Sequence, residues 1–327
     1  MAISISPKVL CFRINDYNDL AFCPLFFLKD HYFFRGQADA KWRLQTSLER
    51  KYQAYKEESS ETGIKAHNIP ADKEKYFSDA FSKALEYKEE YAAIQTFHRL
   101  SSLTKNLSDI EILARMQHYG AATRLLDVTT SFLIALFFAL EEYGEQDRAV
   151  WIFNSSYFYK HSNLIRDAVH FDLEEEKREA FTKLMSDKDK IYTSSIKEAN
   201  KYIGNPPTGK GNSISIIPLE ITGNNPRLIA QNGAFLFPTN IKKSFKKHLC
   251  SMLKIRENDF FDACINVSEE KFSDESSRDK LNDAVVIKLI IPAGIRHLAD
   301  RLLNAANISY RSIYPDEIGI AKSIKYW

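Results

Sequence analysis

Arg35 is the first residue of the chain whose type and position suggest chemistry, because it directly follows the three aromatic residues at 32–34. Consecutive aromatic residues favour an extended chain, so we expect a strand over residues 32–37. An arginine on the inward face of a strand is costly unless it meets an anion or a carboxylate, and its planar fork suits a phosphate. Gly36 would let a ligand approach the backbone closely. The pattern predicts a phosphate-contacting strand, with a structural salt bridge as the alternative.

A dense polar stretch, residues 117–127, lies between two apolar segments of the sequence. Polar groups packed between core elements need partners. His118 could act as an acid or base or hydrogen-bond a ribose hydroxyl, and Arg124 and Asp127 could pair with each other. The hydroxyls of residues 129–131 would stand at a helix N-terminus, where free N–H groups attract an anion. These residues predict part of an anion site, and the alternative is a helix cap with buried structural pairs.

Two later clusters add an amide and two carboxylates. Arg227 and Gln231 precede Gly233 and a short apolar run, so the Gln231 side chain could hydrogen-bond a ligand amide. The alternative is a simple turn that ends at Gly233. Asp316 and Glu317 stand where the pattern predicts the start of a last helix, and acidic residues at that position complement the helix dipole. Glu317 acting as a catalytic carboxylate is the other interpretation.

The notable cluster of like charge is the basic run of Lys242, Lys243, Lys246 and Lys247. A solvated helix face is the first interpretation, and neutralisation of nucleic-acid phosphates is the second. With 45 Lys and Arg residues against 43 Asp and Glu residues, the chain is not a uniformly basic nucleic-acid coat. A nucleic-acid contact would therefore have to come from this local patch.

Histidines and cysteines form no metal-site pattern in the sequence. The 8 histidines are scattered, and the 4 cysteines (Cys11, Cys23, Cys250 and Cys264) include no C-x-x-C pair. We therefore expect no metal ion and expect the cysteines to be reduced and mostly buried. The N-terminus lacks an export signal, and the longest apolar run, residues 132–140, is half of what a bilayer span of about 20 residues needs. We expect a cytoplasmic protein that does not cross a membrane.

These candidate residues need a framework of helices and strands to bring them together. The expected strands are residues 32–37, 149–154, 213–221, 228–230, 234–237 and 283–291, and the expected helices are residues 72–100, 108–117, 132–140, 173–185 and 294–307. Their irregular spacing, and the lack of a G-x-G-x-x-G motif after a strand, indicate an α+β fold rather than regular βαβ units. We expect a single domain over residues 1–327, with helical insertions at residues 50–116 and 156–205.

Taken together, the polar clusters resemble the FRG domain, a family named for its Phe-Arg-Gly motif. The resemblance is carried by Phe34-Arg35-Gly36-Gln37, by the run from Gln117 to Asp127, by Thr130-Ser131 with the following Ala-Leu-Phe-Phe-Ala, by Arg227 to Phe235 and by Tyr314 to Ala321. These motifs occur in order and cover residues 33–321. The family name does not itself define a reaction.

A more distant likeness implies a reaction. The aromatic-Arg-Gly strand, and the hydroxyl cluster that leads into an apolar helix, resemble the arginine/serine/glutamate class of ADP-ribosyltransferases. This resemblance implies a split β-sheet core and NAD as the substrate, with Arg35, Ser131 and Glu317 as catalytic residues. It implies NAD binding by Arg35, Gly36, Gln37, His118, Tyr119, Arg124, Thr129, Thr130 and Gln231. Where the class carries Glu-x-Glu, this chain has Gln231-Asn-Gly, so Gln231 orients the substrate, or Glu317 supplies the acid, or catalysis is absent.

The resemblance therefore implies an NAD-dependent ADP-ribosyltransferase, an intracellular toxin or phage-defence effector that modifies a nucleic acid, with RNA favoured, or a protein. An antitoxin or chaperone would be a partner of such an effector. The rival hypothesis is a non-catalytic nucleotide-binding sensor, which the missing acid favours. A nuclease ranks third, because no carboxylate cluster for two metal ions is evident in the sequence.

Overall fold

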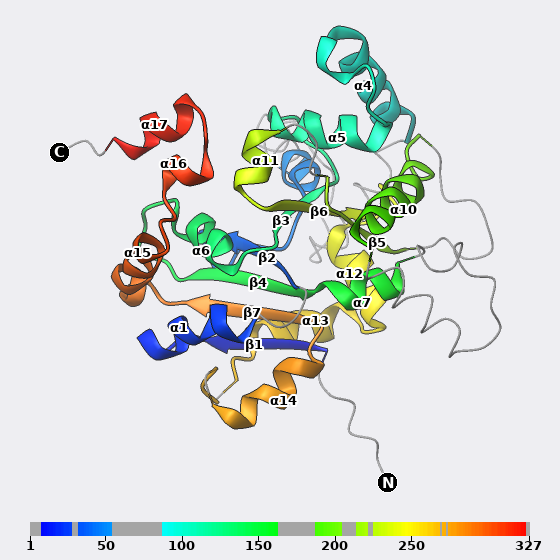
Figure 1. The fold of residues 1–327 in the computed structure, drawn as a ribbon. Coiled ribbons are helices and arrows are strands. Elements are labelled where there is room, and N and C mark those ends of the chain that lie inside the picture. Colours follow the sequence, from blue (N-terminus) through cyan, green and yellow to red (C-terminus); the bar gives the residue numbers. More distant parts are fainter. Residues whose placement is uncertain are drawn as a thin grey trace, which may run out of the picture.

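The computed structural model describes residues 8–27, 32–53, 87–162, 187–204, 214–221, 225–268, 270–272 and 274–324. Within these residues the chain forms a mixed sheet of seven strands in the order β1-β7-β4-β2-β3-β6-β5 (Figure 1). The strands are β1 (Val9–Arg13), β2 (Tyr32–Gln37), β3 (Leu126–Thr129), β4 (Arg148–Asn154), β5 (Ile216–Leu219), β6 (Gly233–Pro238) and β7 (Val286–Ile291). β1 runs parallel to β7, and the other neighbouring strands are antiparallel. This arrangement confirms the predicted α+β class.

Helices cover both faces of the sheet. They are α1 (Tyr17–Phe26), α4 (Tyr87–Leu100), α5 (Asp109–His118), α6 (Phe132–Leu140), α7 (Ser155–His161), α10 (Lys188–Asn200), α11 (Pro226–Ala230), α12 (Phe245–Leu253), α13 (Glu257–Ile265), α14 (Glu275–Asp283), α15 (Arg296–Ala305), α16 (Tyr310–Ile313) and α17 (Glu317–Ser323). One buried cluster joins α1, α6 and α15 to one face, and a second joins α5, α10 and α12 to the other.

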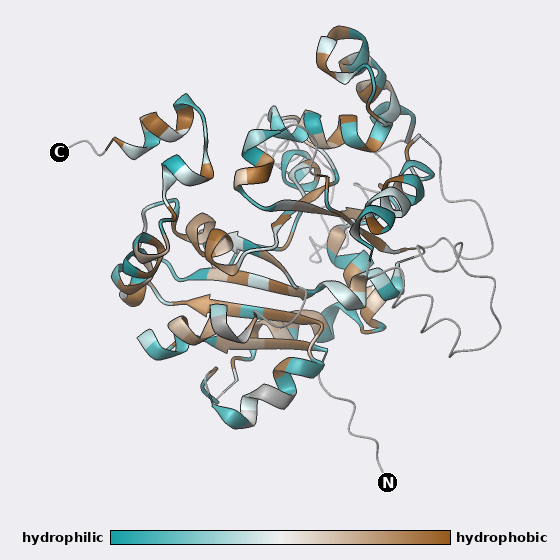
Figure 2. Ribbon diagram, viewed as in Figure 1, coloured by the Kyte–Doolittle hydropathy of each residue, from teal (hydrophilic) through white to brown (hydrophobic). Residues whose placement is uncertain are grey.

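Alternating side chains along the central strands divide between these two hydrophobic clusters. Phe33 and Trp151 belong to the cluster with α5 and α12, whereas Phe34 and Ile152 belong to the cluster with α6. Successive strand residues point to opposite faces, so apolar residues at every position of a strand indicate burial on both sides. Figure 2 shows the central strands as predominantly hydrophobic ribbon. Because Arg35 is two residues after Phe33, it belongs to the face that α5 covers.

The sheet opens between β2 and β3. β2 pairs with β4 along all of residues 32–37, but the register of β2 with β3 contains the single pair Phe34 and Thr129 within the described strands. β3 continues to pair with β6, where Thr129 lies opposite Gly233. The strands β2 and β3 therefore meet at one position and leave an opening toward the C-terminal end of β2.

Several predicted elements are confirmed, one predicted strand is wrong and one short strand was not predicted. The strand at 32–37 is β2, and α5 begins after Ser108 with the capping box that Glu111 completes. The predicted strand at 228–230 is instead part of α11, because the Asn225 side chain accepts hydrogen bonds from the first backbone N–H groups and Pro226 fits the first turn of a helix. Residues 126–129 form β3, which the sequence pattern did not predict.

Other predicted elements are covered only in part by the described residues. Of the expected helix over residues 72–100, the described portion is α4. The expected helix at residues 173–185 lies outside the described residues. The four cysteines are free and buried, as expected. No helix in the described part of the chain is long and apolar enough to cross a bilayer.

A buried histidine at the start of α12 gives the fold a dependence on pH. His248 accepts a hydrogen bond from the Asn240 backbone N–H through Nε2 (3.0 Å), and its Nδ1 lies 2.8 Å from the Ser244 carbonyl oxygen. Nδ1 must therefore carry the proton of the neutral ring. Burial, together with the charges of Arg124 and Lys243, lowers the pKa of His248 to about 4.

We expect acid to destabilise the fold through this histidine. In the unfolded chain this histidine is protonated below about pH 6.5, whereas in the folded protein it stays neutral until about pH 4. The free energy of unfolding therefore decreases as pH falls from 6.5 to 4. The contribution at pH 5 is about 2 kcal/mol. Urea unfolding at pH 7 and pH 5 should show that acidification is less unfavourable to stability in His248→Gln than in the unchanged protein, by about this amount. Equal losses in both proteins would contradict the assignment.

A second buried side chain at the N-terminus of α12, Glu49, gives stability the opposite pH dependence and is tested by a separate variant. Glu49 accepts a hydrogen bond from the Phe245 backbone N–H (2.6 Å), and burial raises its pKa to about 7. Between about pH 4.5 and pH 7, Glu49 is protonated in the folded protein and charged in the unfolded chain. Its contribution to the free energy of unfolding therefore increases as pH falls from about 7 to 4.5. Glu49→Gln should therefore make the loss on acidification larger than in the unchanged protein.

Candidate functional site

A cavity of about 670 Å³ lies in the opening between β2 and β3. Its volume falls within the range of about 300–1,000 Å³ that is usual for small-molecule sites. The walls come from β2, β3, β6, α5, α6 and α11, and from the segment that follows β2. Arginines at positions 35, 43, 50, 115 and 227 line it, together with carboxylates at positions 111, 127, 141 and 142.

Arg35 stands at the centre of this opening. Its Nη1 donates a hydrogen bond to the Asp127 carbonyl oxygen (2.8 Å) and lies 4.0 Å from the Asp127 carboxylate. Its Nε is buried and has no hydrogen-bond partner among the described residues. Burial lowers the pKa of Arg35, and the nearby Arg50 adds to that effect, whereas Asp127 opposes it. Arg35 thus bridges the two strands across the gap and keeps donor capacity in a cavity whose environment disfavours its charge.

The two residues that follow Arg35 have structural roles. A Cβ atom on Gly36 would collide with the Ala135 carbonyl oxygen and approach the Ala139 nitrogen to 2.5 Å. Gly36 also lines the cavity, but the close approach that requires glycine is made by α6. Buried Gln37 accepts a hydrogen bond from Trp151 Nε1 (2.7 Å) and donates one to the Arg43 carbonyl oxygen (3.1 Å).

The hydroxyl cluster at residues 129–131 mainly builds the start of α6. Ser131 is the N-cap, and its Oγ accepts a hydrogen bond from the Ile134 backbone N–H (3.4 Å). Thr129 Oγ1 donates to the Gln231 carbonyl oxygen (2.8 Å) and accepts from the Ser131 N–H (3.1 Å). Thr130 is exposed, and Thr129 alone of these three is among the described residues that line the cavity.

Of the two expected nucleotide contacts at residues 118 and 119, one lines the cavity and the other does not. His118 lines the cavity from the end of α5, and burial together with Arg227 and Arg115 lowers its pKa. Tyr119 is 61% exposed and lies outside this cavity, with its ring 6.4 Å from the Phe97 ring on α4. Of this pair, His118 is the residue that the fold brings to the site.

Arg124 is a buried structural residue and does not pair with Asp127. Its Nη2 donates to the Glu90 carboxylate (2.6 Å) and to the Tyr202 carbonyl oxygen (2.8 Å), and its Nη1 donates to the Thr239 carbonyl oxygen (3.1 Å). Its guanidinium also lies 4.3 Å from the centre of the Phe237 ring. Asp127 instead accepts a hydrogen bond from Gln117 Nε2 (2.6 Å).

Glu317, the predicted catalytic carboxylate, lies outside the cavity lining, whereas Gln231 lies in it. Gln231 lines the cavity, and its Nε2 donates to the Ile313 carbonyl oxygen (3.4 Å). Glu317 is exposed at the first position of α17 and is not among the described cavity-lining residues, while Asp316 caps that helix. Glu141 lines the cavity but accepts a hydrogen bond from the Tyr314 hydroxyl (2.9 Å).

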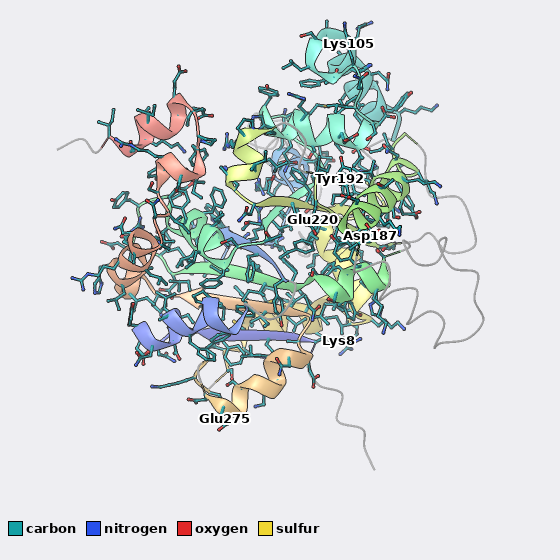
Figure 3. The ribbon with its side chains drawn as sticks, in the orientation of Figure 1. Lys8, Lys105, Asp187, Tyr192, Glu220 and Glu275 are labelled. Atoms are coloured by element: carbon teal, nitrogen blue, oxygen red, sulfur yellow. The ribbon has the colours of Figure 1, made fainter. Side chains whose placement is uncertain are left out.

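Carboxylates on the other wall are also engaged. Glu111 lines the cavity from α5, where it accepts hydrogen bonds from the Ser108 hydroxyl (2.6 Å) and the Tyr192 hydroxyl (2.9 Å). Figure 3 labels Tyr192 on α10, the helix that brings this hydroxyl to α5. Among the described residues no group of three His, Cys, Asp or Glu side chains is placed to hold a metal ion. The site is therefore an arginine-rich cavity whose lining also contains carboxylates, amides and the His118 imidazole.

Several residues that shape this cavity were not predicted from the sequence, among them one aromatic, one arginine and one carboxylate. Trp42, Arg50 and Glu141 line it, although none belongs to a polar cluster in the sequence. The sequence feature that could have identified Trp42 is a tryptophan between two basic residues, Lys41 and Arg43. A search for regularly spaced buried residues does not select it, because its side chain is 49% exposed.

The basic run lies away from the cavity lining. Lys246 and Lys247 each lie 3.2 Å from the Glu257 carboxylate, so part of their charge is balanced by α13. Lys242 and Lys243 are half-buried just before α12.

Comparison with protein families adds one finding. The family model of the FRG domain matches residues 30–148, which include Phe34-Arg35-Gly36 and the polar run from Gln117 to Asp127. Over these residues the chain is similar to the FRG domain. Neither the curated proteins nor the solved structures contained a match.

The residues that match the family model supply only part of the cavity. β2, α5, β3 and α6 lie within the matched residues, and they carry Arg35, His118 and Thr129. α11 and β6 lie beyond the match and contribute Arg227 and Gln231. A complete site therefore needs the part of the chain that follows the FRG domain.

Proposed function

We propose that this FRG protein binds NAD in the cavity and transfers its ADP-ribose group. The observation that carries this proposal is Arg35, whose buried Nε has no partner among the described residues although the guanidinium faces the cavity. A diphosphate in the cavity would pair with the exposed part of this guanidinium and restore the charge balance that burial disturbs. The ADP-ribosyltransferase resemblance is carried by the aromatic-Arg-Gly strand, the hydroxyl cluster at residues 129–131 and the segment from Gln231. These lie on or beside β2, β3 and β6, which are neighbours in the sheet, and this also supports the proposal.

The reaction would break the bond between ribose C1′ and the nicotinamide nitrogen. Nicotinamide leaves as a neutral molecule with the bond electrons, an oxocarbenium-like centre develops at C1′, and an acceptor nucleophile attacks it and loses a proton to solvent. Arg35 would hold the diphosphate, and the cavity walls around the reacting ribose would limit attack by water. Gln231, in the place of the missing acid, would accept a hydrogen bond from a ribose hydroxyl but would add no negative charge beside C1′.

That last point favours a second candidate function, which is nucleotide binding without turnover. Gln231 lines the cavity where the ADP-ribosyltransferase resemblance calls for an acid, and Glu317 is exposed elsewhere. A sensor module needs the arginines and the shape of the cavity but not the carboxylate. Nicotinamide release separates the two functions.

The test is to incubate the purified protein with NAD and to measure nicotinamide by chromatography. We expect slow release from the unchanged protein and release at least about tenfold faster from Gln231→Glu, because a carboxylate would stabilise the developing positive charge. Asn232→Asp is the matched control, since it adds the same charge on the neighbouring exposed residue. NAD binding without release by either protein would establish the second function, and absence of NAD binding would overturn the proposal.

The acceptor in this proposal is nucleic acid, with RNA favoured over protein, in the setting of a toxin or phage-defence effector. It rests on the basic run and on the arginines that surround the cavity. Mass spectrometry of cellular RNA and protein after incubation with NAD would identify the modified class.

A further inference from the structure

The cavity has two distinct ends, which the strand register defines. At the closed end, β2 and β3 meet at Phe34 and Thr129, and the Thr129 hydroxyl donates a hydrogen bond to the Gln231 carbonyl oxygen. At the open end, the chain leaves β2 after Gln37 and runs through a segment whose Trp42 and Arg50 line the cavity. Arg35 lies between the two ends.

Trp42 offers an exposed aromatic surface at the open end. Trp42 is 49% exposed, whereas Trp151 on β4 is 3% exposed. An indole in this position exposes apolar surface to water inside a cavity lined by arginines. Such a surface favours a planar ligand group that can stack on it.

The segment that carries Trp42 is fixed at several points. The Trp42 backbone N–H donates to the Asp39 carbonyl oxygen (3.1 Å), and the Ala40 N–H donates to the Asp147 carbonyl oxygen (2.8 Å). The Arg43 carbonyl oxygen accepts a hydrogen bond from Gln37 (3.1 Å). The backbone that carries the indole is therefore held in place before any ligand binds, which reduces the entropy cost of ordering this segment.

Arg50 supplies positive charge beside this surface. It lies in the helical residues 47–53, where its Nη1 donates to the Gln45 carbonyl oxygen (2.8 Å). The preceding residue, Glu49, is buried and bonded to the N-terminus of α12, which fixes the helical turn. Arg50 and Arg35 both line the cavity, and the charge of Arg50 contributes to the lowered pKa of Arg35. An anion with two charged groups would balance both guanidinium charges.

We propose that Trp42 and Arg50 form a subsite for the nucleoside diphosphate half of the ligand. The base stacks on the Trp42 indole, and the diphosphate lies between the Arg50 and Arg35 guanidinium groups. This inference rests on the proposed function for its ligand class, and it assigns the orientation: base at the open end, reacting ribose at Gln231.

Calorimetric titration with ADP and with inorganic pyrophosphate tests this subsite. Trp42→Ala should weaken ADP binding by about tenfold or more, the usual effect of removing a stacking aromatic, and should leave pyrophosphate binding unchanged. Trp42→Phe should keep ADP affinity within about threefold, since it retains an aromatic face. Arg50→Ala should weaken both ligands. Tyr17→Ala is the control, because Tyr17 is 45% exposed on α1, outside the cavity lining.

The outcomes separate this inference from the proposed function. Equal weakening of ADP and pyrophosphate by Trp42→Ala would show a general disturbance of the cavity and would overturn the stacking role. Unchanged ADP affinity in Trp42→Ala would overturn it as well, even if nicotinamide is released. A base-dependent effect of Trp42 without nicotinamide release would support the subsite and reject transfer.

Discussion

Replacing Arg35 with lysine is expected to slow nicotinamide release from NAD by about 100-fold and to weaken NAD binding to a similar degree. Hydrogen bonds between charged partners contribute about 1.5–3 kcal/mol each, and lysine cannot present two donors to a diphosphate in the fixed geometry of a guanidinium. About 3 kcal/mol of lost stabilisation corresponds to about a 100-fold change. The measurements are the initial rate of nicotinamide release and the dissociation constant of NAD.

Arg35 also bridges β2 and β3, so its replacement needs a check on folding. Lysine keeps a donor that can reach the Asp127 carbonyl oxygen, whereas alanine removes it, so Arg35→Ala should lower the thermal midpoint more than Arg35→Lys. Arg13→Lys is the matched control, because Arg13 is half-exposed and pairs with Asp147 outside the cavity lining. Wild-type affinity and rate in a folded Arg35→Lys protein would refute the role of Arg35.

Replacing Arg124 with methionine is expected to reduce the free energy of unfolding by about 3–5 kcal/mol, the usual cost of breaking a buried ion pair. The Arg124 and Glu90 side chains are 3% and 6% exposed, so methionine would leave the carboxylate without its counter-charge. The carbonyl oxygens of Tyr202 and Thr239 would also lose a donor. Urea unfolding measures the effect.

The pH dependence of Arg124→Met identifies the cause of the loss. Burial already raises the pKa of Glu90, and Arg124 opposes that shift, so removing Arg124 should raise this pKa further. The variant should therefore recover stability as pH falls and Glu90 becomes neutral. Adding Glu90→Gln should restore part of the stability at pH 7. Arg256→Met, at an exposed ion pair, is the control and should change unfolding little. A similarly small effect of Arg124→Met would contradict the structural assignment.

The parts of the fold that the sequence predicts correctly are those with local causes. The aromatic run before Arg35 determines β2, and the Ser108 capping box determines the start of α5. The α11 error has a local cause too, because Asn225 and Pro226 are helix-start residues that precede an apolar stretch resembling a strand. β3 has only four residues, and so short a segment carries little periodicity.

The candidate site could be predicted only in part, because its partners are far apart in the sequence. Arg124 reads as a ligand contact next to Asp127, but its carboxylate partner is Glu90 on α4. Gly36 reads as a position for ligand approach, and only the packed helix shows that α6 occupies that space. The neighbourhood of Trp42 and Arg50 with Arg35 depends on how the chain turns after β2, which no local pattern specifies.

The single pair between β2 and β3 also limits how independently the matched region can fold. Residues 30–148 contain β2 and β3 but end at the first residue of β4, and the strands β6 and β7 follow later. A fragment with these bounds would present two strands joined at one position, with unpaired edges on both sides. The family match is thus the portion of the protein in which the motif occurs, and we expect a stably folded fragment to need the later strands as far as β7.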